Sequence, residues 1–367
     1  MSFRSPRVTG FLPVVLGCLA FTLPHEITAQ PVIAIGDAPR VNGLRINFRD
    51  RRLEEVNGIN ITVWSPARPA RGEVNGLAIG IPRTGAATID GIGVGVFGVE
   101  AQERFSGIGL GLFGVGAGES ANGILLGGIG VGSGGSVRGL AVGGIGVGGG
   151  GDLRGVMIGG IGAGTGGTAQ GLLIGGIGAG AGGGMRGISV GGVGVGSGGD
   201  VTGISIGGVG VGAGGRLRGL SIGGVGVGAG GGMSGITIAG VGAGSGGDVT
   251  GLTIAGIGVG SGGTIKWVSI AGGGIGAVRV EGLAIAPAVG GREVHAFAIA
   301  PAFLRVVENG TQHGVGLSAV SYIQGTQRGL TIGVVNYTWV LDGLQIGLIN
   351  IARDNPRGRR VLPLVNW

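Results

Sequence analysis

The chain is built from a short unit of apolar residues and glycines that recurs at a constant spacing. All the central units have the same length. They open at Gly123, Gly139, Gly155, Gly171, Gly187, Gly203, Gly219, Gly235 and Gly251, and Trp267 occupies the next opening position. Less regular units open from Gly43 to Gly107 and from Gly282 to Gly343, which makes about twenty in all. Such a period is typical of stacked copies of one small structural unit.

The unit that spans 139–154 shows which elements to expect. Leu140 and Val142 alternate with smaller residues, as they would in a strand that turns one apolar face to a core. Ile145 and Val147 alternate in the opposite phase, and two glycines lie where the phase changes. We therefore predict two short strands, a glycine bend and a glycine-rich outer turn in each unit. The strand face opposite the core is expected to be nearly bare.

This pattern predicts an all-β, glycine-rich repeat array, and two geometries satisfy it. We favour a β-solenoid with about 16 residues per unit, in which equivalent strands stack in parallel about 4.8 Å apart. Near-identical consecutive units stack identically most simply in this way. In the alternative, Gly143-Gly144 forms a hairpin turn, and the hairpins close into a barrel or a flower-like ring.

An outer-membrane β-barrel is the membrane form of that alternative. The length of the apolar segments suits a membrane strand, and Trp367 resembles the aromatic C-terminus of such barrels. These barrels also carry girdles of aromatic residues, whereas this chain has no Trp or Tyr between Trp64 and Trp267. The solenoid therefore remains the favoured prediction.

Four segments follow from this pattern. Residues 1–29 are predicted to be a signal peptide, and 30–75 an N-terminal cap with the first divergent repeats. Residues 76–266 contain the regular glycine-rich repeats, and 267–367 contain divergent repeats and a C-terminal cap. Caps are expected because an uncovered apolar end of a repeat array would aggregate.

Residues 1–29 have the features of a secretory signal. Arg4 and Arg7 precede an apolar stretch from Val8 to Leu23, and small residues precede Gln30, the expected start of the mature chain. Cys18, the single cysteine, also lies in a context that resembles a bacterial lipobox. Cleavage before Gln30 is the favoured interpretation, and lipidation of Cys18 is the alternative.

Composition narrows the class of protein further. The chain has 99 Gly among 367 residues but only 12 Pro, which excludes collagen. It is 43% hydrophobic, too apolar for a disordered glycine-rich linker. The formal net charge is +7, but the basic residues are dilute and not interleaved with aromatic residues. A nucleic-acid partner is therefore not expected.

The most divergent units resemble a known family. Residues 343–352 read Gly-Leu-Gln-Ile-Gly-Leu-Ile-Asn-Ile-Ala, and related openings begin at Val41, Val56 and Val74. This segment resembles the repeats of uncharacterised bacterial surface-repeat proteins with NGLQIGLINIA-type units. The likeness is close at the ends of the chain and loose across its centre. It implies a location in the bacterial cell envelope and no known activity.

The residues that most often carry chemistry form no recognisable constellation in the sequence. His295 and His313 lie in different units, and we interpret them as ordinary face or loop histidines. Asp152, Asp200 and Asp248 recur in every third unit, which indicates duplication of three-unit blocks. A row of hydroxyls is expected on the face opposite the core, at Ser189, Ser205, Ser221, Thr237, Thr253 and Ser269. We predict no catalytic, cofactor-binding or metal-binding residue and no cofactor.

These features predict a non-catalytic, exported protein of the bacterial cell envelope with a structural or binding role, adhesive or self-associating. Its expected partners are further copies of itself or an envelope component, either a glycan or a membrane surface. The expected location is the outer membrane, the cell surface or the periplasm, and secretion from the cell is a further option. No small-molecule substrate is inferred.

Overall fold

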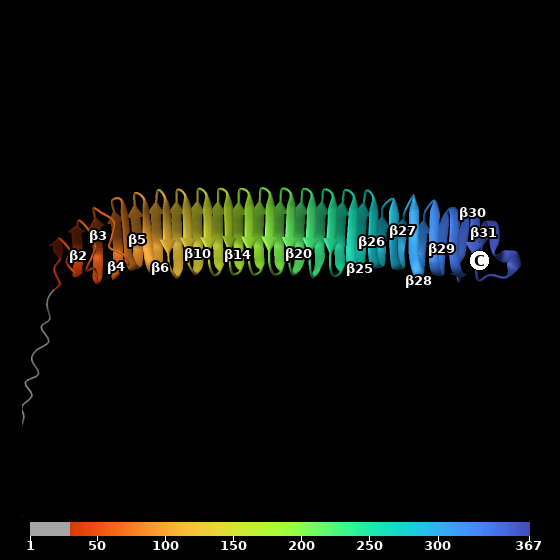
Figure 1. The fold of residues 1–367 in the computed structure, drawn as a ribbon, viewed down its shortest axis with the longest axis horizontal. Helices are drawn as coiled ribbons and strands as arrows, with labels where there is room; N and C mark the ends of the chain where they lie inside the picture. The colour runs from red at the N-terminus through yellow and green to blue at the C-terminus, as the bar shows by residue number, and fades with distance from the viewer. Residues whose placement is uncertain (1–29) are drawn as a thin grey trace, which may run out of the picture. The chain divides into compact units, whose positions relative to one another are not determined.

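The computed structural model describes residues 30–367, and Pro31–Trp367 form one compact unit with its own core (Figure 1). The predicted signal peptide, with Cys18, lies outside the described residues. The compact unit is a parallel β-solenoid of about twenty coils, built from a 31-stranded sheet that winds along its axis.

The first coils contain strands of unequal length. They are β1 (Ile33–Ile35), β2 (Arg40–Asn47), β3 (Glu55–Thr62), β4 (Glu73–Gly80), β5 (Arg83–Gly95) and β6 (Gly98–Gly111). Each of them pairs in parallel with the next, and Gly43, Gly58 and Gly76 are register partners. The irregular spacing of the first units therefore does not disturb the stacking.

Every central coil contains one long and one short strand. The long strands are β8 (Ser120–Gly127), β10 (Ser136–Gly143), β12 (Leu153–Gly159), β14 (Ala169–Gly175), β16 (Met185–Gly191), β18 (Val201–Gly207), β20 (Arg216–Gly223), β22 (Gly232–Ala239) and β24 (Val249–Ala255). The short strands are β7 (Gly114–Ala117), β9 (Gly130–Ser133), β11 (Gly146–Gly149), β13 (Gly162–Thr165), β15 (Gly178–Ala181), β17 (Gly194–Ser197), β19 (Gly210–Ala213), β21 (Gly226–Ala229) and β23 (Gly242–Ser245).

The last coils contain longer strands and a reversal at the end. They are β25 (Gly258–Ala271), β26 (Gly274–Ile285), β27 (Ala288–Ile299), β28 (Phe303–Leu317), β29 (Val320–Leu341), β30 (Leu344–Ala352), the 3₁₀ helix η1 (Arg357–Arg359) and β31 (Val361–Asn366). β31 pairs antiparallel with β30, so the final strand covers the last edge of the parallel stack.

The register confirms the predicted solenoid. Long strand β10 pairs in parallel with β12, with Gly139 opposite Gly155 and Leu140 opposite Val156. Short strand β11 pairs in parallel with β13, again between equivalent positions of successive units. The alternative geometry, with hairpins closed into a ring, is wrong because neighbouring strands come from successive units and run in the same direction.

The glycine that opens each unit bends the long strand. From Gly123 to Gly251 these glycines have φ between 108° and 120°, a region that residues with a Cβ rarely adopt. A Cβ on Gly203 would also overlap the carbonyl oxygen of Gly187 in the preceding coil. Glycine therefore recurs at this position because the backbones of successive coils approach each other directly.

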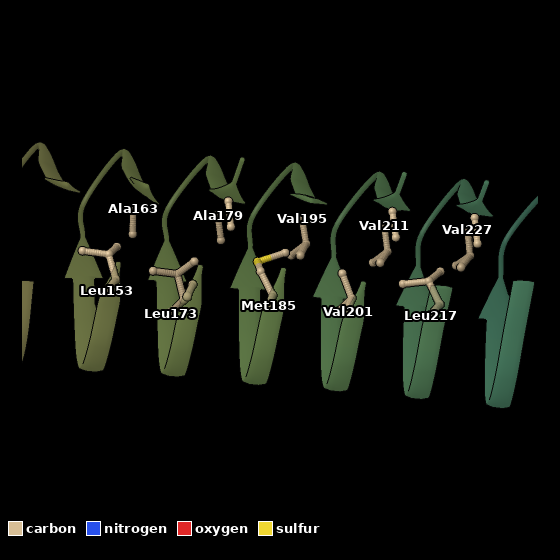
Figure 2. Packing of buried hydrophobic residues seen from close by; sticks show 14 of the residues in the cluster. Leu153, Ala163, Leu173, Ala179, Met185, Val195, Val201, Val211, Leu217 and Val227 are labelled. Atoms are coloured by element: carbon tan, nitrogen blue, oxygen red, sulfur yellow. The ribbon is translucent and has the colours of Figure 1, made fainter. Parts of the chain in front are cut away.

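The interior of each coil is narrow and holds few side chains. In one coil Leu153, Met157 and Ala163 point inward, and each is at most 3% exposed. Figure 2 shows such side chains between the long and short strands, including Met185 opposite Val195. A large side chain is accommodated where its neighbours are small. Phe105 occupies the space that a Cβ on Gly93 or Gly109 would need. The core is therefore a single column of well-matched residues.

The predicted orientation of the strand residues is wrong. Ala141, between Leu140 and Val142, is fully buried, so the two larger residues point outward. The same holds farther along the stack, where Ile204 and Ile206 are 36% and 37% exposed and flank the buried Ser205. The two halves of the bent long strand and the short strand surround the interior of each coil. This interior is too narrow for all three segments to carry large side chains, so small residues face inward at many positions.

The two ends of the stack have polar interiors. In the first coils Arg45 is fully buried, forms ion pairs with Asp37 and Asp50, and donates from Nη1 to Asn60 Oδ1 over 2.9 Å. In the last coils Gln345 Nε2 donates to Gln327 Oε1 over 2.9 Å, and both side chains are buried. These contacts offset part of the cost of burying polar groups, although Gln345 Oε1 itself has no hydrogen-bond partner among residues 30–367.

We expect Gly203→Ala to destabilise the stack. The positive φ alone costs about 1–3 kcal/mol for a residue with a Cβ, and the overlap with Gly187 adds to this. Gly212→Ala is the matched control, because a Cβ there meets no heavy atom within 4 Å. Urea unfolding followed by circular dichroism should show a lower midpoint for the first variant alone; equal midpoints would contradict the proposed role of the opening glycine.

Candidate functional site

The outward side chains after the opening glycine form one long apolar surface. Two columns begin at Leu44 and Ile46 and continue to Leu344 and Ile346, and their register positions carry apolar residues in every coil. We call these two columns, with the neighbouring corner column that contains Ile145, the apolar face. Ile145 is 50% exposed, and its equivalents Ile161, Ile177 and Val193 are similarly exposed.

The backbone does not contribute polar groups to the apolar face. Its N–H and C=O groups bond to the strands before and after it, along the axis of the stack. Hydrogen bonds of the corner residues run the same way, for example from Ile161 N to Ile145 O over 2.7 Å. The face therefore presents aliphatic side chains over a fully paired sheet.

The hydroxyl row predicted for the solvent face lies in the core. Ser189, Ser205, Ser221, Thr237, Thr253 and Ser269 are all at most 4% exposed. Ser189 Oγ donates to Met185 Sδ over 3.5 Å, so this hydroxyl packs against the core methionine. These residues fit the interior because they are small, and they are not available to a ligand on the surface.

A polar column runs along one edge of the apolar face, at the residue before each opening glycine. From Arg138 to Lys266 this column reads Arg138, Arg154, Gln170, Arg186, Thr202, Arg218, Ser234, Thr250 and Lys266. It contains cations and neutral side chains but no carboxylate. Arg154 and Arg218 form ion pairs with Asp152 and Asp200, which lie in the adjacent outer turns.

Trp267 interrupts the row of opening glycines at the same edge. It pairs with Gly251 in register and adopts φ of 82°, the conformation that glycine has elsewhere in the row. Its side chain is 69% exposed. A bulky residue at positive φ is strained, and strain that persists at an exposed position suggests a functional use for the side chain.

The other edge of the apolar face is aromatic near the N-terminal end. Phe48 and Trp64 stack with ring centroids 6.3 Å apart, and Phe97 and Phe113 lie 5.1 Å apart. All four are at least 47% exposed. Exposed aromatic pairs of this kind are common where a protein meets another apolar surface.

The recurring aspartates close the outer turns. Asp152, Asp200 and Asp248 each accept a hydrogen bond through Oδ1 from a backbone N–H in the next turn, over 2.8–2.9 Å. Asp152 also accepts from the Thr168 hydroxyl over 2.8 Å. The bonds from Thr168 and the nearby Arg154 charge lower the pKa of Asp152 below its ordinary value of 3.8. These carboxylates therefore connect successive turns, a role that their spacing alone did not indicate.

The two histidines predicted to lie in separate units are neighbours. His295 and His313 are register partners in β27 and β28, and their rings lie 5.7 Å apart in an edge-on arrangement. An insertion in β28 makes the separation between them longer than the usual period, so the repeat spacing did not predict this pairing. Glu293 Oε2 lies 4.0 Å from His295 Nε2. Within residues 30–367 no group of three His, Cys, Asp or Glu side chains could hold a metal ion.

A hollow near the C-terminal end combines aromatic and polar groups. Tyr322 and Tyr337 stack with centroids 5.0 Å apart, and Trp339 and Glu308 also line the hollow. Gln324 Nε2 donates to the Tyr322 hydroxyl over 3.3 Å. The return of aromatic residues here was visible in the sequence, but their grouping required the register.

Comparison with known proteins found no matching family model, no matching curated protein and no matching solved structure. In the part of the chain that the structure describes, no helix has the length and apolar character needed to cross a membrane.

We expect Trp267→Gly to stabilise the protein. Glycine adopts positive φ without strain, which should raise the free energy of unfolding by about 0.5–2 kcal/mol after the entropic cost of glycine. Trp339→Gly is the control, because Trp339 has an ordinary φ within β29 and should lose stability when replaced. Thermal unfolding measures both, and a lower midpoint for Trp267→Gly would contradict the strain at this position.

The pKa of Asp152 should be measurably low. Because its folded-state pKa is depressed, the turn contact contributes stability above pH 3.8 and loses it as the pH falls through the lowered value. Carbon-13 NMR titration should place the Asp152 midpoint below 3.8. Thr168→Val removes the hydroxyl donor and should move that midpoint upward, while an unchanged midpoint would exclude this bond as a cause.

Proposed function

We propose that this protein is a non-catalytic component of a bacterial cell envelope, with a structural or binding role. The continuous apolar face is the observation that carries the proposal. The largest apolar patch on a typical soluble monomer covers about 300–600 Å². About twenty rungs spaced ~4.8 Å apart, each about six residues wide, give this face about 1,900 Å². A surface of this size is expected to be covered by another surface.

Two further observations support a non-catalytic role. The hydroxyl row lies in the core, and the recurring aspartates bond to the backbone of the next turn. The long, regular stack also suits a protein that spans or covers a distance, because every coil offers the same surface to its surroundings. The resemblance of residues 343–352 to bacterial surface repeats agrees with an envelope location.

Fractionation of a bacterium that produces the full chain tests this proposal. We expect the protein in the envelope fraction, with a mature N-terminus at Gln30 by intact mass. Recovery in the cytoplasm with residues 1–29 still attached would overturn the envelope location.

A further inference from the structure

We propose that the apolar face binds the surface of a lipid bilayer with anionic headgroups. This inference rests on the proposed envelope role and names the partner. The solenoid would lie along the membrane, with the apolar face among the acyl chains nearest the headgroups and the rest of each coil in water.

The chemistry of the face fits hydrocarbon. Protein–protein interfaces carry about one hydrogen bond per 100–200 Å². The two main columns of the apolar face, from Leu44 and Ile46 to Leu344 and Ile346, contain no hydrogen-bonding side chain over the whole stack. The backbone beneath them is already paired between coils, so lipid would leave no N–H or C=O unsatisfied.

The edges of the face fit the headgroup region. The polar column is separated from the first apolar column only by the opening glycine, so Arg138, Arg186 and Lys266 would lie at the level of the phosphates. Long basic side chains can keep an apolar stem in contact with lipid while the charge reaches the headgroups. The absence of carboxylates from this column between Arg138 and Lys266 complements an anionic surface.

Exposed aromatic residues lie at both edges. Trp267 occupies the edge beside Lys266, while Phe97 and Phe113 occupy the opposite corner. Trp and other aromatic residues prefer the boundary between headgroups and acyl chains. A bilayer contact would also explain why the strained backbone of Trp267 carries an indole where neighbouring units carry glycine.

Sedimentation with vesicles tests the inference. The chain without residues 1–29 is used, because Pro31–Trp367 form a compact unit and a signal segment would itself bind lipid. We expect it to sediment with vesicles of phosphatidylethanolamine and phosphatidylglycerol, and less strongly with phosphatidylcholine alone. The variant Ile206→Lys/Ile238→Lys places two charges on the apolar face and should weaken partition by about tenfold or more.

The matched control adds the same charges to the same coils on the polar column. Thr202 and Ser234 are exposed, and Arg218 is the register partner of both. Thr202→Lys/Ser234→Lys should therefore keep full binding. Circular dichroism confirms that both variants retain the β-fold, and the comparison of lipids with the unmodified chain remains decisive if a variant does not fold.

Three results would overturn the inference. They are no sedimentation of the unmodified chain with anionic vesicles, equal binding by the two double variants, and self-association that Ile206→Lys/Ile238→Lys abolishes while vesicles remain unbound. The last result would assign the face to a second copy of the chain. Binding to vesicles by a protein that remains in the cytoplasm would refute the envelope location alone, so the two failures are distinguishable.

Discussion

The close contact of one coil with the next at the opening glycine is the constraint on which the rest of the structure depends. There the backbones meet without an intervening side chain, and the strand bends at positive φ. This bend brings three strand segments around a narrow interior. The interior then accepts few side chains per coil. A large side chain fits only beside small residues, as Phe105 does beside Gly93 and Gly109.

A narrow interior gives the protein its unusual distribution of residues. On the strand segment after the opening glycine, alanine, serine and threonine occupy many of the inward positions, while leucine, isoleucine and valine flank them on the outside. The same inversion explains the segment that resembles bacterial surface repeats, since Gln345 and Asn350 are buried there and Leu344, Ile346 and Leu348 are exposed. Apolar residues on the outside stabilise the fold little by themselves, which makes an external partner the natural explanation for them.

The two ends of the stack differ from its centre in their side chains and in their strand pairing. A solenoid of identical coils would leave an open edge at each end, where another strand could pair. At the first coils the buried Arg45 cluster replaces aliphatic packing with specific polar contacts. Burial alone would raise the pKa of Asp37 there, but hydrogen bonds from the Arg51 and Arg52 amides and the charges of Arg45 and Arg52 together lower it. At the other end β31 reverses direction against β30.

The sequence by itself determined the period and the all-β class, and it favoured parallel stacking because near-identical units of constant length repeat their contacts most simply in one register. The structure decided between this geometry and the hairpin alternative, because neighbouring strands come from successive units and run in the same direction. The sequence could not determine which strand face is inward, since alternation distinguishes two faces without saying which one the coil encloses. Only the tertiary structure decided this, through the width of the interior. Only the structure likewise showed that His295 pairs with His313, because an insertion in β28 shifts the register before this pair and lengthens the spacing between the two residues.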